Sequence, residues 1–144
     1  MRFVVATLHF AGLGFALRLQ DEGHEVLLAF AGTTDRRLEE RYEMVGAGLV
    51  PRMALPETMA RRAEWRDAIW IWDENHSVRE NEQLRAEGFK VFGGGSYPDR
   101  MEHDREACLR LMSEHGLKPP PSFAFTSADD ALRFPTRAHK MNST

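Results

Sequence analysis

This sequence has a single cysteine, no long apolar run and no large excess of positive or negative charge, and each of these shortages excludes a class of protein. Cys108 is the only cysteine, so the chain forms no internal disulfide, which fits a reducing cytoplasm. No stretch approaches the roughly 18 apolar residues of a membrane span, and the N-terminal apolar run is shorter than a signal-peptide core. The formal net charge of -3 gives no basic surface for nucleic acid or an anionic membrane. We therefore expect a soluble cytoplasmic protein with neither kind of partner.

Common signatures of catalysis and metal binding are also missing. The 6 histidines include no pair with the spacing of a zinc protease, so we expect no metal site. There is no Walker A loop and no Gly-x-Ser-x-Gly elbow around a nucleophile. Arg61, Arg62 and Arg66 do cluster, but glutamates interleave with them, so we expect a solvated, salt-bridged face. The sequence therefore assigns no catalytic residue.

The order of short apolar runs and glycines indicates alternating strands and helices. Residues 2–7 form an apolar, valine-containing run that predicts a buried strand. A loop with two glycines follows, then a helical pattern over residues 15–23 and a second strand over residues 24–30. A strand, loop, helix and strand within about 30 residues have the size of a βαβ unit.

The same succession of helix, glycine and strand recurs later in the chain. It predicts strands at residues 68–72 and 89–92 and helices at residues 77–87 and 99–116. Gly23, Gly88 and Gly116 stand near the ends of helices, because glycine takes the left-handed conformation of a helix C-cap without steric cost. Ser77 and Glu80 have the spacing of a capping box at a helix start.

Weaker patterns fill the rest of the chain. They favour helices at residues 35–44 and 57–65, an exposed strand at residues 122–126, and a short helix that Ser127 caps. The tail from Pro135 has little that could pack, so we expect it to fray.

Strands that alternate with helices predict an α/β fold, a three-layer, Rossmann-like parallel sheet with helices on both faces. The run at residues 68–72 is so apolar that it indicates a central strand covered on both faces, with Trp70 and Trp72 buried. We assign residues 1–117 to this domain. Residues 118–144 would be either the start of a further region or a frayed tail.

Ligands of such sheets bind at the carboxyl ends of the strands, so three loops become candidate binding segments. They span residues 9–15, 73–77 and 93–97. The candidate ligand-binding residues within them are Gly12, Leu13, Gly14, Phe15, Asp73, Glu74, Asn75, Gly93, Gly94, Gly95 and Ser96.

Each loop has a functional and a structural interpretation. Gly12 and Gly14 open a helix whose free N–H groups and positive dipole suit a phosphate or another anion, and a tight turn without a ligand is the alternative. The polar run from Asp73 to Asn75 could hydrogen-bond a hydroxylated or amino substrate, or could simply cap the next helix. The glycine triplet at residues 93–95 would allow a ligand to approach the backbone closely. It could instead act as a hinge, or simply as a flexible connection to the next helix.

The order of these segments resembles the N-terminal domain of phosphoribosylamine–glycine ligase, an ATP-grasp enzyme. The resemblance is carried by the glycine loop and its Ala-Leu helix, by Glu22-Gly23-His24, and by residues 84–93, 100–120 and 127–132. Their order along most of the chain is a stronger signal than any one motif, and the match is weakest over residues 33–67.

The resemblance implies a pre-ATP-grasp domain that supplies part of the substrate pocket of a ligase, as in purine biosynthesis. Such enzymes activate a carboxylate as an acyl phosphate, which an amine then attacks. ATP and Mg²⁺ are implied for a full-length parent, bound by later ATP-grasp subdomains, with no cofactor in this chain. We therefore expect an anionic small-molecule substrate, the missing ATP-grasp domains as partners, residues 118–144 as the start of the ATP-grasp region, and no activity from this chain alone.

The chain departs from the family at several positions. Residues 11–15 (AGLGF) stand where the family has Gly-Gly-Arg-Glu-His, so the implied function is the broader class of carboxylate–amine ligases. Two alternatives stay open. A nucleotide-binding oxidoreductase would need a small residue at Leu17 and an acid after Phe30, which this chain lacks. A non-catalytic Rossmann-like binding or interaction module is the other alternative.

Overall fold

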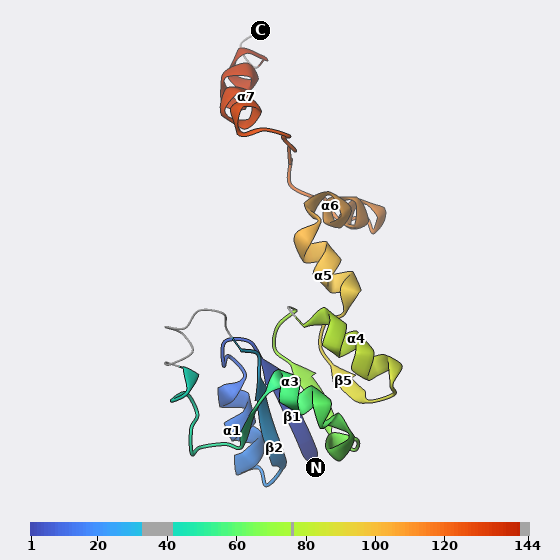
Figure 1. Cartoon of the computed structure of the whole chain (residues 1–144). Helices are drawn as coiled ribbons and strands as arrows, with labels where there is room; N and C mark the ends of the chain where they lie inside the picture. The colour runs from blue at the N-terminus through green and yellow to red at the C-terminus, as the bar shows by residue number, and fades with distance from the viewer. Residues whose placement is uncertain (33–41, 76, 142–144) are drawn as a thin grey trace. The chain divides into compact units, whose positions relative to one another are not determined.

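Five short apolar strands that pair in parallel organise the first part of the chain. The computed structural model describes residues 1–32, 42–75 and 77–141, with side chains to residue 134. The strands are β1 (Arg2–Thr7), β2 (Glu25–Phe30), β3 (Arg52–Ala54), β4 (Ile69–Trp72) and β5 (Lys90–Phe92). They form one sheet in the order β3-β2-β1-β4-β5, and every pairing is parallel (Figure 1). The prediction of an α/β, Rossmann-like parallel sheet is confirmed.

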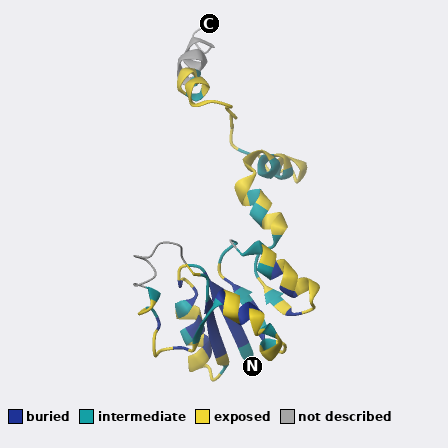
Figure 2. Cartoon of the chain, in the orientation of Figure 1, coloured by how far each residue is buried: buried dark blue, intermediate teal, exposed yellow. Residues whose placement is uncertain are grey.

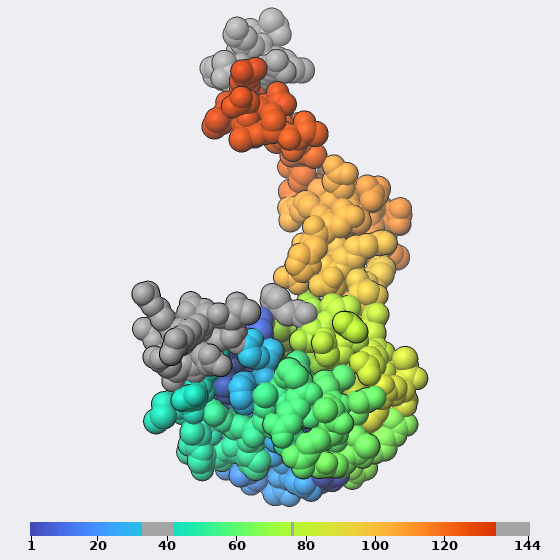
Figure 3. Space-filling model, viewed as in Figure 1, coloured from blue at the N-terminus to red at the C-terminus, as the bar shows by residue number. Residues whose placement is uncertain are grey.

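Helices pack on both faces of this sheet. They are α1 (Leu13–Asp21), α3 (Leu55–Ala60), the short 3-10 helix η1 (Arg62–Trp65) and α4 (Val78–Ala86). The next helix, α5 (Ser96–His103), contacts α4 and buries no residue of its own. Because side chains alternate along a strand, Val5 packs in one cluster with Leu19 of α1. Val4 packs on the opposite face with Leu55 of α3 and Leu84 of α4. Figure 3 shows the green surface of α3 on the viewer's side of the strands that Figure 1 draws.

The strand β4 is buried unevenly. Trp70 is 0% exposed and Trp72 is 7% exposed, as predicted, and both lie on the face that α3 and α4 cover. Ile69 and Ile71 point to the other face and are only half-buried. The expectation of full cover on both faces is therefore wrong for this strand, because α1 packs mainly on β1 and β2. Figure 2 shows the contrast between the buried strands and the exposed outer sides of the helices.

The predictions made from the sequence are more accurate for the C-termini of the helices than for their N-termini. Gly23, Gly88 and Gly116 have φ values of 81°, 80° and 74°, which confirms them as left-handed C-cap residues. Ser77 does occupy the N-cap of α4, but its side chain makes no capping hydrogen bond, so the predicted capping box is wrong. The strand β3 was not expected, since its three residues include an arginine and are too few to show a pattern.

Two predicted helices differ from the structure. The helix expected over residues 99–116 is two helices, α5 and α6 (Arg105–Glu114), because the side chain of Asp104 caps the second one. Its Oδ1 accepts a hydrogen bond of 2.9 Å from the backbone N–H of Ala107. The helix expected over residues 57–65 divides into α3 and η1. The helix expected over residues 35–44 falls mostly outside the described residues.

The contacts along the chain divide it into two compact units, Met1–Cys108 and Leu109–Thr144. In the second unit, the rings of Phe123 and Phe125 lie 4.4 and 5.2 Å from the ring of Phe134. Residues 122–126 do not form the predicted strand, and every strand among the described residues pairs within the five-stranded sheet instead. Ser127 caps α7 (Ala128–Met141) as predicted, by accepting a 3.2 Å hydrogen bond from Asp130 N, but the helix continues past the point expected to fray.

None of the helices within the described ranges combines the length and the apolar character needed to cross a membrane.

Candidate functional site

The strand order changes direction between β1 and β4. From β1 the sheet continues through β2 and β3 on one side, whereas β4 and β5 lie on the other. Doubly wound sheets bind ligands outside the carboxyl ends of the strands at such a switch point. The loops that follow β1 and β4 flank this point, and they contain the first two predicted binding segments. His76, in the second loop, lies outside the described residues.

Gly12 stands at a position where a side chain would not fit. A Cβ atom there would lie 2.8 Å from Cγ1 of Val5 and 2.9 Å from Oδ2 of Asp73. Leu13, Gly14 and Phe15 form the first turn of α1, and Gly14 faces open space. Packing therefore requires glycine at the N-cap but does not require it two residues later.

Asp73 connects the first loop to the second. Burial raises the pKa of Asp73, and hydrogen bonds from the Thr7 hydroxyl and the Gly12 N–H offset only part of that effect. A carboxylate of the protein itself thus lies at the positive end of α1. An external anion at this helix would be met by the next N–H groups, those of Gly14 and Phe15.

The structure adds His9 and Tyr42, which the sequence reasoning did not single out. The backbone N–H of His9 donates to Oε1 of Glu74 over 3.3 Å, and its Nδ1 lies 2.9 Å from the Tyr42 hydroxyl. The neighbouring Phe10 is buried with a φ of 57°, and its ring stacks on Phe30. A left-handed non-glycine residue persists only where packing holds it. His9 could have been predicted as a site residue, because it follows the first strand closely in the sequence. Nothing in the sequence places Tyr42 beside it, because only the fold brings the two residues together.

The third loop is fixed by α4. In the glycine triplet, residues 93–95, the first two carbonyls accept hydrogen bonds of 2.6 Å each from Arg85 Nη2 and Asn81 Nδ2. Glu82 Oε1 accepts a 2.8 Å hydrogen bond from the backbone N–H of Ser96, and contacts with Ser96 lower the pKa of Glu82. This carboxylate caps α5, whose N-cap is Gly95 and has no side chain of its own.

Close packing also explains the glycine triplet. Gly93 has a φ of 148°, and a Cβ atom there would lie 2.8 Å from Cβ of Trp72. A Cβ atom at Gly94 would overlap the side chain of Asn75. Asn75 in turn donates from Nδ2 to Oε2 of Glu102 in α5 over 3.0 Å. Asn75 thereby connects the second loop to the third, as Asp73 connects the first to the second.

These contacts bring all three predicted loops to one polar edge. The edge presents the carboxylates of Asp73 and Glu74, the amide of Asn75, and the pair of His9 and Tyr42. A cavity of only about 10 Å³ beside Asp73 and Glu74 is also lined by Ala6, Thr7, Leu8, Leu55, Trp72 and Ser77, so a ligand larger than a water molecule would lie on the open edge outside it. Carboxylate and amide oxygens accept hydrogen bonds, so the edge suits a ligand that carries amino or hydroxyl groups.

Comparison with known proteins gives no relative from which a function could be transferred. No family model matches the chain, and no curated protein or solved structure matches it either.

Proposed function

We propose that this chain is the substrate-binding N-terminal domain of an ATP-dependent carboxylate–amine ligase resembling phosphoribosylamine–glycine ligase, and that it is not catalytically complete alone. One observation carries the proposal: the loops after β1 and β4 meet at the switch point of the sheet, where Asp73 lies against Gly12, and Asn75 joins the loop after β5 to them by lying against Gly94. The order of sequence segments that resembles the ligase supports it further.

The proposed substrate is a small anion that also carries an amine. Its anionic group lies at the first turn of α1, where the N–H groups of Gly14 and Phe15 and the helix dipole favour negative charge. Its amino and hydroxyl groups donate to Asp73 and Glu74, which accept hydrogen bonds through their carboxylate oxygens. The chain thus binds and orients the amine, and the acyl phosphate that the amine attacks forms on other subdomains.

A nicotinamide-dependent oxidoreductase fits the same edge less well. Such enzymes use an acidic residue at the end of the second strand to bind the ribose hydroxyls. Here β2 ends at Phe30, and Ala31 and Gly32 follow. This observation favours a sugar phosphate or a similar anion over a dinucleotide.

ATP and Mg²⁺ belong to the ATP-grasp subdomains that the proposed parent enzyme contains. Within the described part of the chain, no three histidine, cysteine, aspartate or glutamate side chains are grouped to hold a metal ion. We therefore assign no step of the reaction to a metal held by this chain. We place the protein in the cytoplasm, where the nucleotide and the small-molecule substrates are found.

Calorimetry with ribose 5-phosphate tests the proposal, because this stable sugar phosphate keeps the anion and the hydroxyl groups. Gly14→Val should lower the affinity at least about tenfold, or roughly 1.4 kcal/mol, by blocking the first turn of α1. Gln20→Val is the matched control, since it places the same side chain on an exposed position of the same helix. Equal affinity in both variants, with equal melting temperatures, would contradict the proposal.

A further inference from the structure

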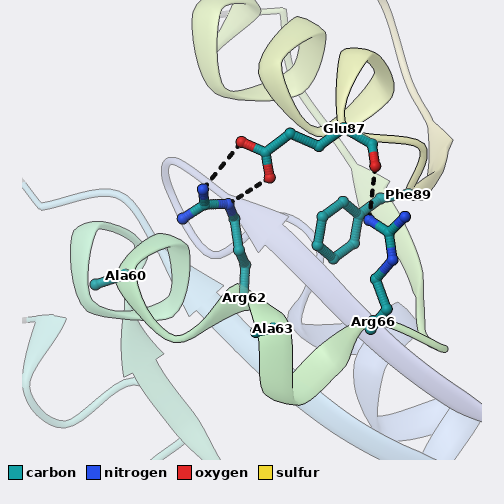
Figure 4. Close-up of a pocket in the computed structure, with 6 residues that line it drawn as sticks. All are labelled: Ala60, Arg62, Ala63, Arg66, Glu87 and Phe89. Carbon is teal, nitrogen blue, oxygen red and sulfur yellow. Dashed lines mark hydrogen bonds and ion pairs between the residues drawn. The ribbon is translucent and has the colours of Figure 1, made fainter.

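A second hollow lies at the opposite, amino edge of the sheet. It has a volume of about 430 Å³ and is lined by Ala60, Arg62, Ala63, Arg66, Glu87 and Phe89 (Figure 4). Arg66 precedes β4 and Phe89 precedes β5, so the hollow lies where these strands begin. Its volume falls within the range of small-molecule sites, about 300–1,000 Å³.

The guanidinium group of Arg62, in this hollow, donates hydrogen bonds to other groups of the protein. Its Nε and Nη2 donate to the two carboxylate oxygens of Glu87 over 2.7 and 2.9 Å, and its Nη1 donates to the carbonyl of Met59 over 2.9 Å. The hydrogen bonds from Arg62, with one from Gln83, lower the pKa of Glu87 to about 2. The carboxylate therefore stays charged at neutral pH and balances Arg62.

The hydrogen bond and the ring contact of Arg66 are both to groups without formal charge, although its charge also helps to lower the pKa of Glu87. Its Nη1 donates to the backbone carbonyl of Glu87 over 2.7 Å, and its Cζ lies 4.3 Å from the centroid of the Phe89 ring. A guanidinium group has five N–H donors, and the bond to the carbonyl uses one of them. Two guanidinium groups and one carboxylate leave the hollow with a net positive charge.

The rest of the lining is apolar. Ala60 and Ala63 contribute methyl groups, and the buried ring of Phe89 lies beside the guanidinium of Arg66 (Figure 4). Arginine that stacks on an aromatic ring presents a flat, rigid fork that matches a carboxylate. The hollow thus places the guanidinium group of Arg66 next to an apolar surface. This combination suits a small organic acid, which has a carboxylate and an apolar body.

We propose that this hollow binds a small organic monoanion, whose carboxylate pairs with Arg66 and whose apolar body rests against Phe89 and the two alanines. The single net charge favours a monoanion, because a second negative charge would be repelled by Glu87. The site is separate from the carboxyl edge, and the proposal does not depend on the ligase assignment.

Titration with benzoate at constant ionic strength tests the proposal, with benzamide as its neutral isostere. The backbone amide signals of Ala63, Glu87 and Phe89 should shift saturably with benzoate, and at least about fivefold more weakly with benzamide. Arg66→Gln keeps a donor for the Glu87 carbonyl but removes the charge, so the benzoate affinity should fall about fivefold or more.

Two further variants keep the test independent of any folding defect. Arg61→Gln removes an exposed charge that pairs with Glu64 and does not line the hollow, so it should leave the benzoate affinity unchanged. Ala63→Leu leaves both arginines in place and fills the hollow from an exposed position, so it should abolish binding. The proposal is overturned by an absence of saturable shifts in the unsubstituted chain, by equal affinity for benzamide, or by unchanged affinity in Arg66→Gln and Ala63→Leu.

Discussion

Gly12 and Asp73 are packed so closely that a Cβ atom at the glycine would lie 2.9 Å from the carboxylate oxygen Oδ2. Helix N-caps usually carry a serine, threonine, aspartate or asparagine, whose side chain bonds to the first N–H groups. In α1 the N-cap is a glycine, which has no side chain for such a bond, and its own N–H donates instead to the carboxylate of Asp73, which follows the neighbouring strand β4. This contact joins the two loops at the switch point of the sheet.

Two glycines of the same loop should respond oppositely to alanine. Gly12→Ala should destabilise the fold by about 1–3 kcal/mol, because the added methyl group overpacks against Val5 and Asp73. Gly14→Ala should stabilise it by about 0.4–1 kcal/mol, since this helical position faces open space and alanine restricts the unfolded chain. Denaturant unfolding measures both values. Equal effects of the two substitutions would contradict the packing at Gly12.

The pH dependence of stability should reveal the buried carboxyl of Asp73. Because burial raises its pKa, ionisation destabilises the folded state relative to the unfolded state. Asp73→Asn removes this cost, so it should be most favourable, relative to the natural chain, at neutral pH. The advantage should shrink as the pH falls through the raised pKa and the natural carboxyl is protonated. Urea unfolding across this range checks the sign, and an advantage that grows in acid would refute it.

The ion pair of Arg62 and Glu87 should have the opposite pH dependence. The bonds from Arg62 lower the pKa of Glu87 from 4.5 to about 2, so the ionised carboxylate stabilises the fold above its ordinary pKa. Glu87→Gln should therefore lower the melting temperature slightly at neutral pH. The difference from the natural chain should disappear as the pH falls toward about 2. A difference that stays constant in thermal scans down to that pH would show that the ionisation of Glu87 does not stabilise the fold.

The isolated chain should not bind ATP tightly. The sequence contains no Walker A loop and no counterpart of the nucleotide-binding lysines that the ATP-grasp resemblance leads us to expect in later subdomains. Calorimetry with ATP and Mg²⁺ should detect no binding at micromolar concentrations. Micromolar affinity would mean that the chain holds a nucleotide site of its own.

The sequence predicted the succession of strands and helices because local signals mark it, above all the glycines that end α1 and α4. The strand β3 escaped prediction because its place comes from pairing with β2, where Leu28 lies opposite Arg52. The break at Asp104 was missed because an aspartate on a charged helix face looks the same whether it faces solvent or caps the next helix. Such choices depend on tertiary contacts.

For the candidate site, parallel topology alone was enough to predict that the three loops share one edge. The contacts within that edge were not predictable from spacing. Asp73 meets Gly12, and His9 meets Tyr42, across 61 and 33 positions of the chain, and only the fold brings such distant residues together. The glycines at residues 93–95 looked like a ligand loop or a hinge, yet their packing against Trp72 and Asn75 accounts for two of them.

Mapping of backbone amide shifts in the presence of ribose 5-phosphate tests the substrate-binding role most directly. The account predicts saturable shifts at Gly14 and Phe15, in the first turn of α1, and at Glu74 and Asn75 after β4, with little change at the amino edge of the sheet. An absence of shifts at the carboxyl edge, or shifts confined to the residues around Arg66, would contradict it.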